Sequence, residues 1–152
     1  MIEYRKALLS DIEAMQSLVA DEVKSGIILE RTSDEMATNI RSYTLALKRD
    51  RVVGFVALHI HSLALAEIRS LVVDEAYRAQ NIGSLLVTEA TAEGKRLGLE
   101  RLLALTYAEK FFLKLGFVEI CKESLPEQKI WADCIRCKHF PICNEIALIK
   151  TL

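Results

Sequence analysis

The sequence predicts a single α/β domain built on a mixed sheet, with an antiparallel meander, a parallel strand pair and helices flanking both faces. The chain has 152 residues, of which 51% are hydrophobic, enough for one domain with a proper core. Three apolar segments follow one another through short polar turns, and helix and strand patterns then alternate. We therefore expect one domain over residues 1–152.

The first half of the chain predicts two helices and four strands. Ser10 and Asp11 stand where they would cap a helix that ends near Gly26, and Thr32 begins a shorter helix followed by acidic residues. The four strands are expected at 2–7, 43–48, 52–61 and 65–73.

The second half predicts a long helix over 82–97, ended by Gly98, and a nearly continuous apolar strand over 99–106. Such a strand is typical of parallel pairing, where both faces are buried. A short helix over 108–115 and strands over 117–121 and 146–152 complete the pattern. The long helix is expected to turn these residues inward: Leu85, Leu86, Thr88, Ala92 and Leu97.

The charge balance favours a small-molecule partner. Twenty Lys and Arg residues against twenty-one Asp and Glu give a net charge of -1, which argues against nucleic acid or an anionic membrane. No apolar run reaches the roughly 18 residues of a membrane-spanning helix, and residues 1–6 lack a signal-peptide pattern. We expect a cytoplasmic protein without membrane or nucleic-acid partners.

Residues 72–87 are the most informative segment. An apolar strand leads through a basic loop with one glycine, Gly83, into an amphipathic helix. The start of a helix leaves about four backbone N–H groups unpaired and carries about half a positive charge, so it can bind a pyrophosphate. Arg78 and Gln80 add side-chain donors. Taken alone, the loop is as compatible with a charged surface turn.

A cysteine cluster lies in the C-terminal segment 125–145. Cys134, Cys137, His139 and Cys143 are four potential ligands for a structural zinc ion with Cys₃His coordination. Unmetallated cysteines that pack as small hydrophobic residues are the alternative. Cys121 lies apart and is expected in the core.

Five segments, in order and spacing, resemble the GNAT superfamily of acetyl-CoA-dependent N-acetyltransferases. They are 11–12, 53–58, 67–73, 77–84 and 111–117. The resemblance implies the GNAT acyl-CoA N-acyltransferase fold, with acetyl-CoA as the co-substrate. It implies cofactor-binding roles, by position, for Leu71, Val72, Val73, Arg78, Ala79, Gln80, Asn81, Ile82, Gly83 and Ser84.

One departure from the family pattern is visible in this loop. Ala79 and Asn81 stand where the family prefers glycine. Asparagine tolerates the left-handed backbone region better than other non-glycine residues, so the loop is still expected to form.

A narrower resemblance links segments 26–32 and 125–134, with Cys137, 140–141 and 143–145, to the short single-domain N-acetylglutamate synthases of bacteria. It implies acetyl transfer to the α-amino group of L-glutamate, the first step of arginine biosynthesis. A site for a dicarboxylate should offer guanidinium groups, and Arg31 and Arg69 are the candidates. For both, a solvated surface position is the alternative.

The chemistry requires a base and a group that protonates the leaving thiolate. Glu67 is the candidate base, acting through a water molecule, with His59 and His61 as alternatives. Phe112 stands where the superfamily carries a tyrosine as general acid, so Tyr107 is the candidate acid. The alternatives are that Tyr107 is an aromatic residue that closes the core, and that the thiolate leaves without assistance.

Two other functions stay open at this point. One is a protein or peptide N-acetyltransferase. The other is a non-catalytic acyl-CoA-binding or metal-sensing module, suggested by Phe112, Asn81 and the cysteine cluster. A homodimer is also open.

Overall fold

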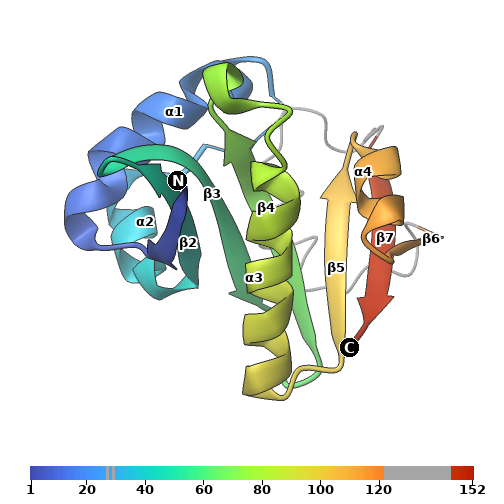
Figure 1. Ribbon diagram of the computed structural model, residues 1–152. Helices are drawn as coiled ribbons and strands as arrows, with labels where there is room; N and C mark the ends of the chain where they lie inside the picture. The colour runs from blue at the N-terminus through green and yellow to red at the C-terminus, as the bar shows by residue number, and fades with distance from the viewer. Residues whose placement is uncertain (27, 29, 122–144) are drawn as a thin grey trace.

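The computed structural model describes residues 1–26, 28, 30–121 and 145–152. These residues form one seven-stranded sheet with the order β1-β2-β3-β4-β5-β7-β6 (Figure 1). The strands are β1 Glu3–Lys6, β2 Tyr43–Lys48, β3 Arg51–Ile60, β4 Leu65–Val73, β5 Arg101–Thr106, β6 Val118–Ile120 and β7 Ile146–Thr151. The helices are α1 Ile12–Lys24, α2 Ser33–Thr38, α3 Ile82–Leu97 and α4 Glu109–Lys114, with 3-10 turns η1 Leu9–Asp11, η2 Ile40–Ser42 and η3 Glu75–Tyr77. The predicted mixed sheet is confirmed.

The sheet changes direction at its centre. Strands β1 to β4 pair antiparallel, and β4 then pairs with β5 in parallel, as the sequence predicted. The parallel register runs from Leu65 opposite Arg101 to Ile68 opposite Ala104 and ends there. The carboxyl-terminal halves of β4 and β5 therefore separate. Beyond β5, β7 pairs antiparallel with both β5 and β6.

Each face of the sheet has its own apolar core. Helices α1 and α2 bury Met15 and Met36 against one face, together with Phe55 of β3. Helix α3 buries Ile82 and Leu86 against the other face, and α4 covers that same face over β7. Figure 1 shows α3 crossing in front of the central strands and α4 in front of β7. The sheet is thus the middle layer of three.

Of the five residues predicted to face inward from α3, only Leu86 is fully buried. Leu85, Thr88 and Leu97 of α3 are exposed, and Ala92 is only half buried. The helix instead buries a stripe that includes small residues, because Gly94 allows close approach: a Cβ there would lie 3.3 Å from the Leu152 side chain. The buried residues of α3 are Ile82, Leu86, Val87, Ala90, Thr91 and Gly94.

Cys121, expected in the core, is exposed. It directly follows β6, a strand of only three residues at the edge of the sheet, so β7 covers it on one side at most.

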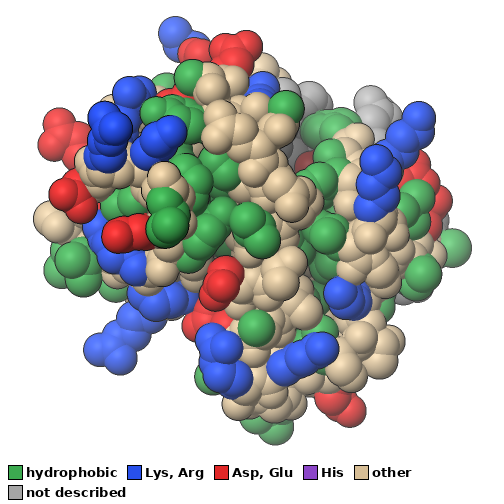
Figure 2. All heavy atoms as spheres, in the orientation of Figure 1, with side chains coloured by type: hydrophobic (Ala, Val, Ile, Leu, Met, Phe, Trp, Pro, Cys, Tyr) green, Lys and Arg blue, Asp and Glu red, His purple; other side chains and the backbone are tan. Residues whose placement is uncertain are grey.

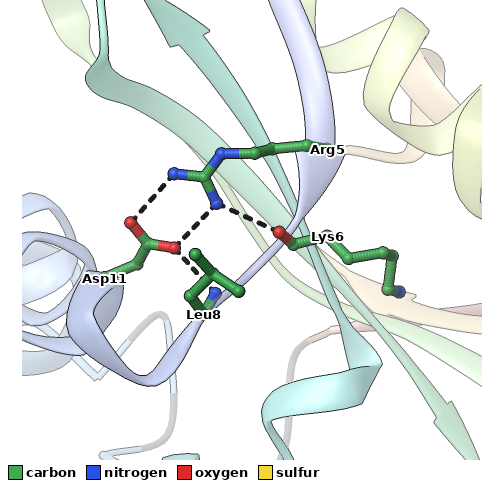
Figure 3. A network of polar contacts seen from close by, with 4 residues as sticks. All are labelled: Arg5, Lys6, Leu8 and Asp11. Carbon is green, nitrogen blue, oxygen red and sulfur yellow. Dashed lines mark hydrogen bonds and ion pairs between the residues drawn. The ribbon is translucent and has the colours of Figure 1, made fainter.

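The start of α1 is held differently from the prediction. Asp11 makes no side-chain cap to the helix. Its carboxylate accepts hydrogen bonds from the Leu8 N–H at 2.7 Å and from both terminal nitrogens of Arg5 at 2.8 and 3.1 Å (Figure 3). This interaction ties β1 to the turn before α1. The second cap was predicted correctly, because Thr32 and Glu35 form a reciprocal capping box.

No helix among the described residues is long and apolar enough to cross a membrane. On the face shown in Figure 2, acidic and basic side chains are interspersed. This distribution matches the near-zero net charge of the sequence.

Candidate functional site

A cavity of about 920 Å³ opens where β4 and β5 separate. In sheets of this kind, ligands bind beyond the carboxyl ends of parallel strands, where the neighbouring connections diverge. The second half of β4 forms one wall, and the end of β5 with the start of α4 forms the other. The lining residues are Glu22, Gly26, Ile28, Arg31, residues 67–73, Tyr77, Arg78, Ala79, residues 81–84, residues 105–108, Phe111, Phe112 and Glu145.

One end of the cavity is the start of α3. This helix has 16 residues, and its N-cap Asn81 makes no side-chain hydrogen bond to the first turn. Its terminal N–H groups are therefore available to an anion. Gly83 lies beside α4, since a Cβ there would be 3.4 Å from the Phe111 ring.

The loop before α3 takes the backbone shape for which glycine is usually used. Ala79 has φ 67° and Asn81 has φ 66°, both in the left-handed region. These are the two positions where the sequence departs from the family pattern. The loop forms without the glycines, at a conformational cost that is larger for alanine than for asparagine.

Nine of the ten residues that the resemblance assigned to the cofactor lie around this cavity; Gln80 is exposed and lies outside its lining. Arg78 is already engaged: its Nε donates to the Val73 carbonyl at 3.2 Å, and its guanidinium pairs with Glu22 at 3.3 Å. Arg78 thus ties the loop to β4 and α1. Val72 is 4% exposed and packs under α1, so it presents main chain rather than side chain to the cavity.

Two polar residues of β4, Glu67 and Arg69, line the cavity; Arg69 contacts His59 of the adjacent β3, and Glu67 contacts His61, the residue directly after β3. Glu67 is 2% exposed, and its Oε1 lies 2.9 Å from Nε2 of His61, whose side chain is 4% exposed. The guanidinium of Arg69 lies 3.0 Å from Nδ1 of His59. The sequence left open whether Glu67 faces solvent. In the structure its carboxylate is buried at the cavity wall.

A bulge in β4 shapes this wall. Phe55 pairs with Val72 and Ala57 with Arg69, so two residues of β4 oppose one of β3. Ser70 lies in the bulge with φ 56°, a conformation uncommon for a non-glycine residue. Bulges redirect the following side chains and increase the local twist. This one coincides with the point where β4 leaves β5.

A smaller pocket of about 250 Å³ adjoins the cavity and shares Ile28, Arg31 and Ser70 with it. Tyr43 and Phe55 form its floor, in edge-to-face contact at 6.0 Å. Burial raises the pKa of the Tyr43 hydroxyl, while the charges of Arg31 and Arg69 act in the opposite direction. Arg31 lines this side pocket, and Arg69 lines the larger cavity beside it.

The opposite wall is aromatic. Tyr107 is 45% exposed at the end of β5 and lines the cavity. Phe112 is buried between Phe111 and Phe117, with ring centroids 5.0 and 5.2 Å away. The phenyl ring therefore completes the core beneath the cavity, at the position where the family carries a tyrosine.

The proposed zinc ligands Cys134, Cys137, His139 and Cys143 lie outside the described residues. Within residues 1–26, 28, 30–121 and 145–152, no group of three or more His, Cys, Asp or Glu side chains could hold a metal ion.

Sequence reasoning missed three features of this site: the bulge at Ser70, the side pocket over Tyr43, and the pairing of the histidines. Only the last had a usable signal. His59 on β3 and His61 just after its end are two residues apart, as Glu67 and Arg69 are on β4. Given the antiparallel register, the two rows must face each other.

Comparisons with known proteins identify the family and the fold. A sequence profile described as the acetyltransferase (GNAT) family matches residues 11–117. An uncharacterized N-acetyltransferase of Chlorobaculum tepidum is 38% identical over 148 residues, covering 97% of this chain and 95% of the relative. An amino-acid acetyltransferase of Mycobacterium tuberculosis is 34% identical over 119 residues, covering 76% of this chain and 68% of the relative.

Among solved structures, N-acetylglutamate synthase from Neisseria gonorrhoeae, complexed with coenzyme A and N-acetyl-glutamate, superposes with a TM-score of 0.88 at 22% identity. The match covers all of this chain and 35% of that longer one. At this identity the likeness concerns the fold.

Proposed function

This chain belongs to the acetyltransferase (GNAT) family, and on that basis we propose that it transfers an acetyl group from acetyl-CoA to the α-amino group of L-glutamate. The observation that carries the proposal is one cavity whose lining includes both the start of α3, a helix end suited to an anion, and two arginines, Arg31 and Arg69. The first suits a pyrophosphate, and the second suits a dicarboxylate.

In this proposal the coenzyme lies along the gap between β4 and β5. Its pyrophosphate accepts hydrogen bonds from main-chain N–H groups of 79–84 at the start of α3. The peptide groups of a strand point alternately to its two sides, so about half of those in the second half of β4 face away from β3 and into the gap. Donors held there would stabilise the negative charge that develops on the thioester oxygen, an effect worth about 3–4 kcal/mol per donor in comparable sites.

The acceptor occupies the arginine end. Arg31 and Arg69 hold the two carboxylates, and this leaves the α-amino group directed at the thioester. Glu67 removes a proton from the ammonium group through a water molecule, which produces the neutral amine that attacks. The amine nitrogen forms the new C–N bond and the C–S bond breaks. Tyr107 protonates the departing thiolate and regains a proton from the second one that the nitrogen releases as the amide forms.

The choice of glutamate has three supports. The side pocket is small and is lined by Arg31, and Arg69 lines the adjoining cavity. Segment 26–32 resembles that of the short bacterial N-acetylglutamate synthases, and the Mycobacterium tuberculosis relative is named an amino-acid acetyltransferase. By this proposal the protein acts in arginine biosynthesis, in the cytoplasm.

The test is a purified protein mixed with acetyl-CoA and a panel of amino acids, with released thiol followed over time. The proposal expects the highest kcat/KM for glutamate. Reaction with peptides alone would replace it with a peptide N-acetyltransferase, and coenzyme binding without turnover on any amine would replace it with a non-catalytic binding module.

A further inference from the structure

We propose that His61 and His59 are positioning residues with different roles. His61 fixes the Glu67 carboxylate for proton removal, and His59 fixes the Arg69 guanidinium for acceptor binding. The inference rests on the proposed function and adds two residues to it. Neither histidine lines the cavity, so both act through the residues that do.

The strand register produces the two pairs. His59 stands opposite Glu67 and Ala57 stands opposite Arg69, yet the contacts run diagonally, from His61 to Glu67 and from His59 to Arg69. Diagonal neighbours in an antiparallel pair lie within reach of long side chains. The two rings also contact each other edge to face, with centroids 4.9 Å apart. Together they form a fixed row behind the cavity wall.

Hydrogen-bond chemistry assigns the protons of both rings. A guanidinium group has donors only, so Nδ1 of His59 must accept, and this ring is neutral with its proton on Nε2. An ionised carboxylate only accepts, so Nε2 of His61 must carry a proton and donate to Glu67. The same residue type therefore serves once as an acceptor and once as a donor.

The consequences for the reaction differ. Glu67 and the His61 side chain are almost completely buried, so removing the His61 donor leaves a buried carboxylate with less stabilisation of its charged form. Loss of this donor disfavours the ionised form of Glu67, which is the form that must accept the proton. Removing the His59 acceptor instead loosens a guanidinium and weakens acceptor binding. The other titratable groups around the cavity, unchanged in both cases, are Glu22, Arg31, Tyr77, Arg78, Tyr107 and Glu145.

The test compares His61→Phe with His59→Phe by steady-state kinetics over pH. His61→Phe should move the ascending limb of the kcat profile up by about one to two pH units, from the strength of a hydrogen bond to a charged group. Its kcat should fall at least about tenfold near neutral pH, and this loss should shrink at high pH. His59→Phe should raise the acceptor KM about tenfold and leave both the limb and the acetyl-CoA KM in place.

Rescue variants separate positioning from folding. The amide nitrogen of glutamine replaces Nε2, so His61→Gln should restore the limb. The amide oxygen of asparagine replaces Nδ1, so His59→Asn should restore the acceptor KM. Ile60→Val, an exposed site between the histidines, is the matched control and should change neither. Equal losses at all pH values in both phenylalanine variants, without rescue, would overturn the proposal.

A measurement without turnover distinguishes this inference from the proposed acceptor. Nitrogen-15 NMR of the full chain reports which ring nitrogen carries the proton. We expect His59 protonated on Nε2 alone and His61 protonated on Nε2; a proton on Nδ1 of His59 at neutral pH would overturn the assignment. If the wild-type protein acetylates another amine, the proposed function fails, and the kinetic split is measured with that amine.

Discussion

Replacing Ala79 with glycine should stabilise the protein. Ala79 is exposed and has φ 67°, where a Cβ is crowded against the neighbouring carbonyl at a cost of about 1–2 kcal/mol. Glycine removes that cost but adds about 0.5–1 kcal/mol of conformational entropy to the unfolded chain. The net expected gain is about 0.5–1 kcal/mol, which corresponds to a rise in Tm of about 1–4 °C for a chain of this size.

Thermal and urea unfolding of Ala79→Gly would measure this gain. Asn81→Gly is one matched control, because Asn81 has a similar φ of 66°. This variant should gain less stability, because asparagine tolerates the left-handed region better than alanine. Ala76→Gly in the turn η3 is the second, and should lose stability because its backbone needs no glycine. If Ala79→Gly is no more stable than the wild type while Ala76→Gly behaves as expected, the strain argument for this loop is refuted.

Three further predictions concern the site and the fold. Arg31→Ala should raise the glutamate KM about tenfold or more and leave the acetyl-CoA KM within about threefold, and equal effects in initial-rate assays would count against its role. Tyr107→Phe should lower kcat without changing either KM; an unchanged kcat would mean that the thiolate leaves unassisted. The hydrogen bond from Arg5, and then that from the Leu8 N–H, lower the pKa of Asp11, so its contribution is present above the ordinary value of 3.8 and is lost as pH falls through the folded value. Asp11→Asn should therefore cost about 0.5–1 kcal/mol in urea unfolding at neutral pH, and the difference should shrink as pH falls below 3.8 and through the folded value; a constant difference would contradict this.

The elements were predictable because their signals are local. Gly98 and Gly116 end their helices with positive φ, and the capping residues at 32–35 begin theirs, so boundaries followed from a few positions each. The inward face of α3 was not predicted correctly, because the prediction assumed that its leucine residues would be buried. Close packing against the sheet instead favours small residues such as Ala90 and Gly94.

The location of the site was also predictable, since it follows from the order of strand, loop and helix around residues 72–87. Its detailed shape was not. The separation of β4 from β5 coincides with a bulge at Ser70. No sequence pattern predicts that a serine will adopt a positive φ. Likewise the side pocket depends on segments far apart in the chain, since Arg31 and Tyr43 meet Ser70 only in the folded structure.

The burial of Glu67 is itself an argument for a chemical role. Its neighbours Ala66 and Ile68 on β4 are buried and apolar, and a hydrophobic residue at 67 would avoid the desolvation of a carboxylate that is 2% exposed. The fold instead keeps this charge and supplies a buried histidine to hold it. Polar groups at such positions lower stability relative to a well-packed apolar alternative, and they occur where function requires them. Glu67→Leu should therefore fold at least as stably as the wild type and lose acetyl transfer.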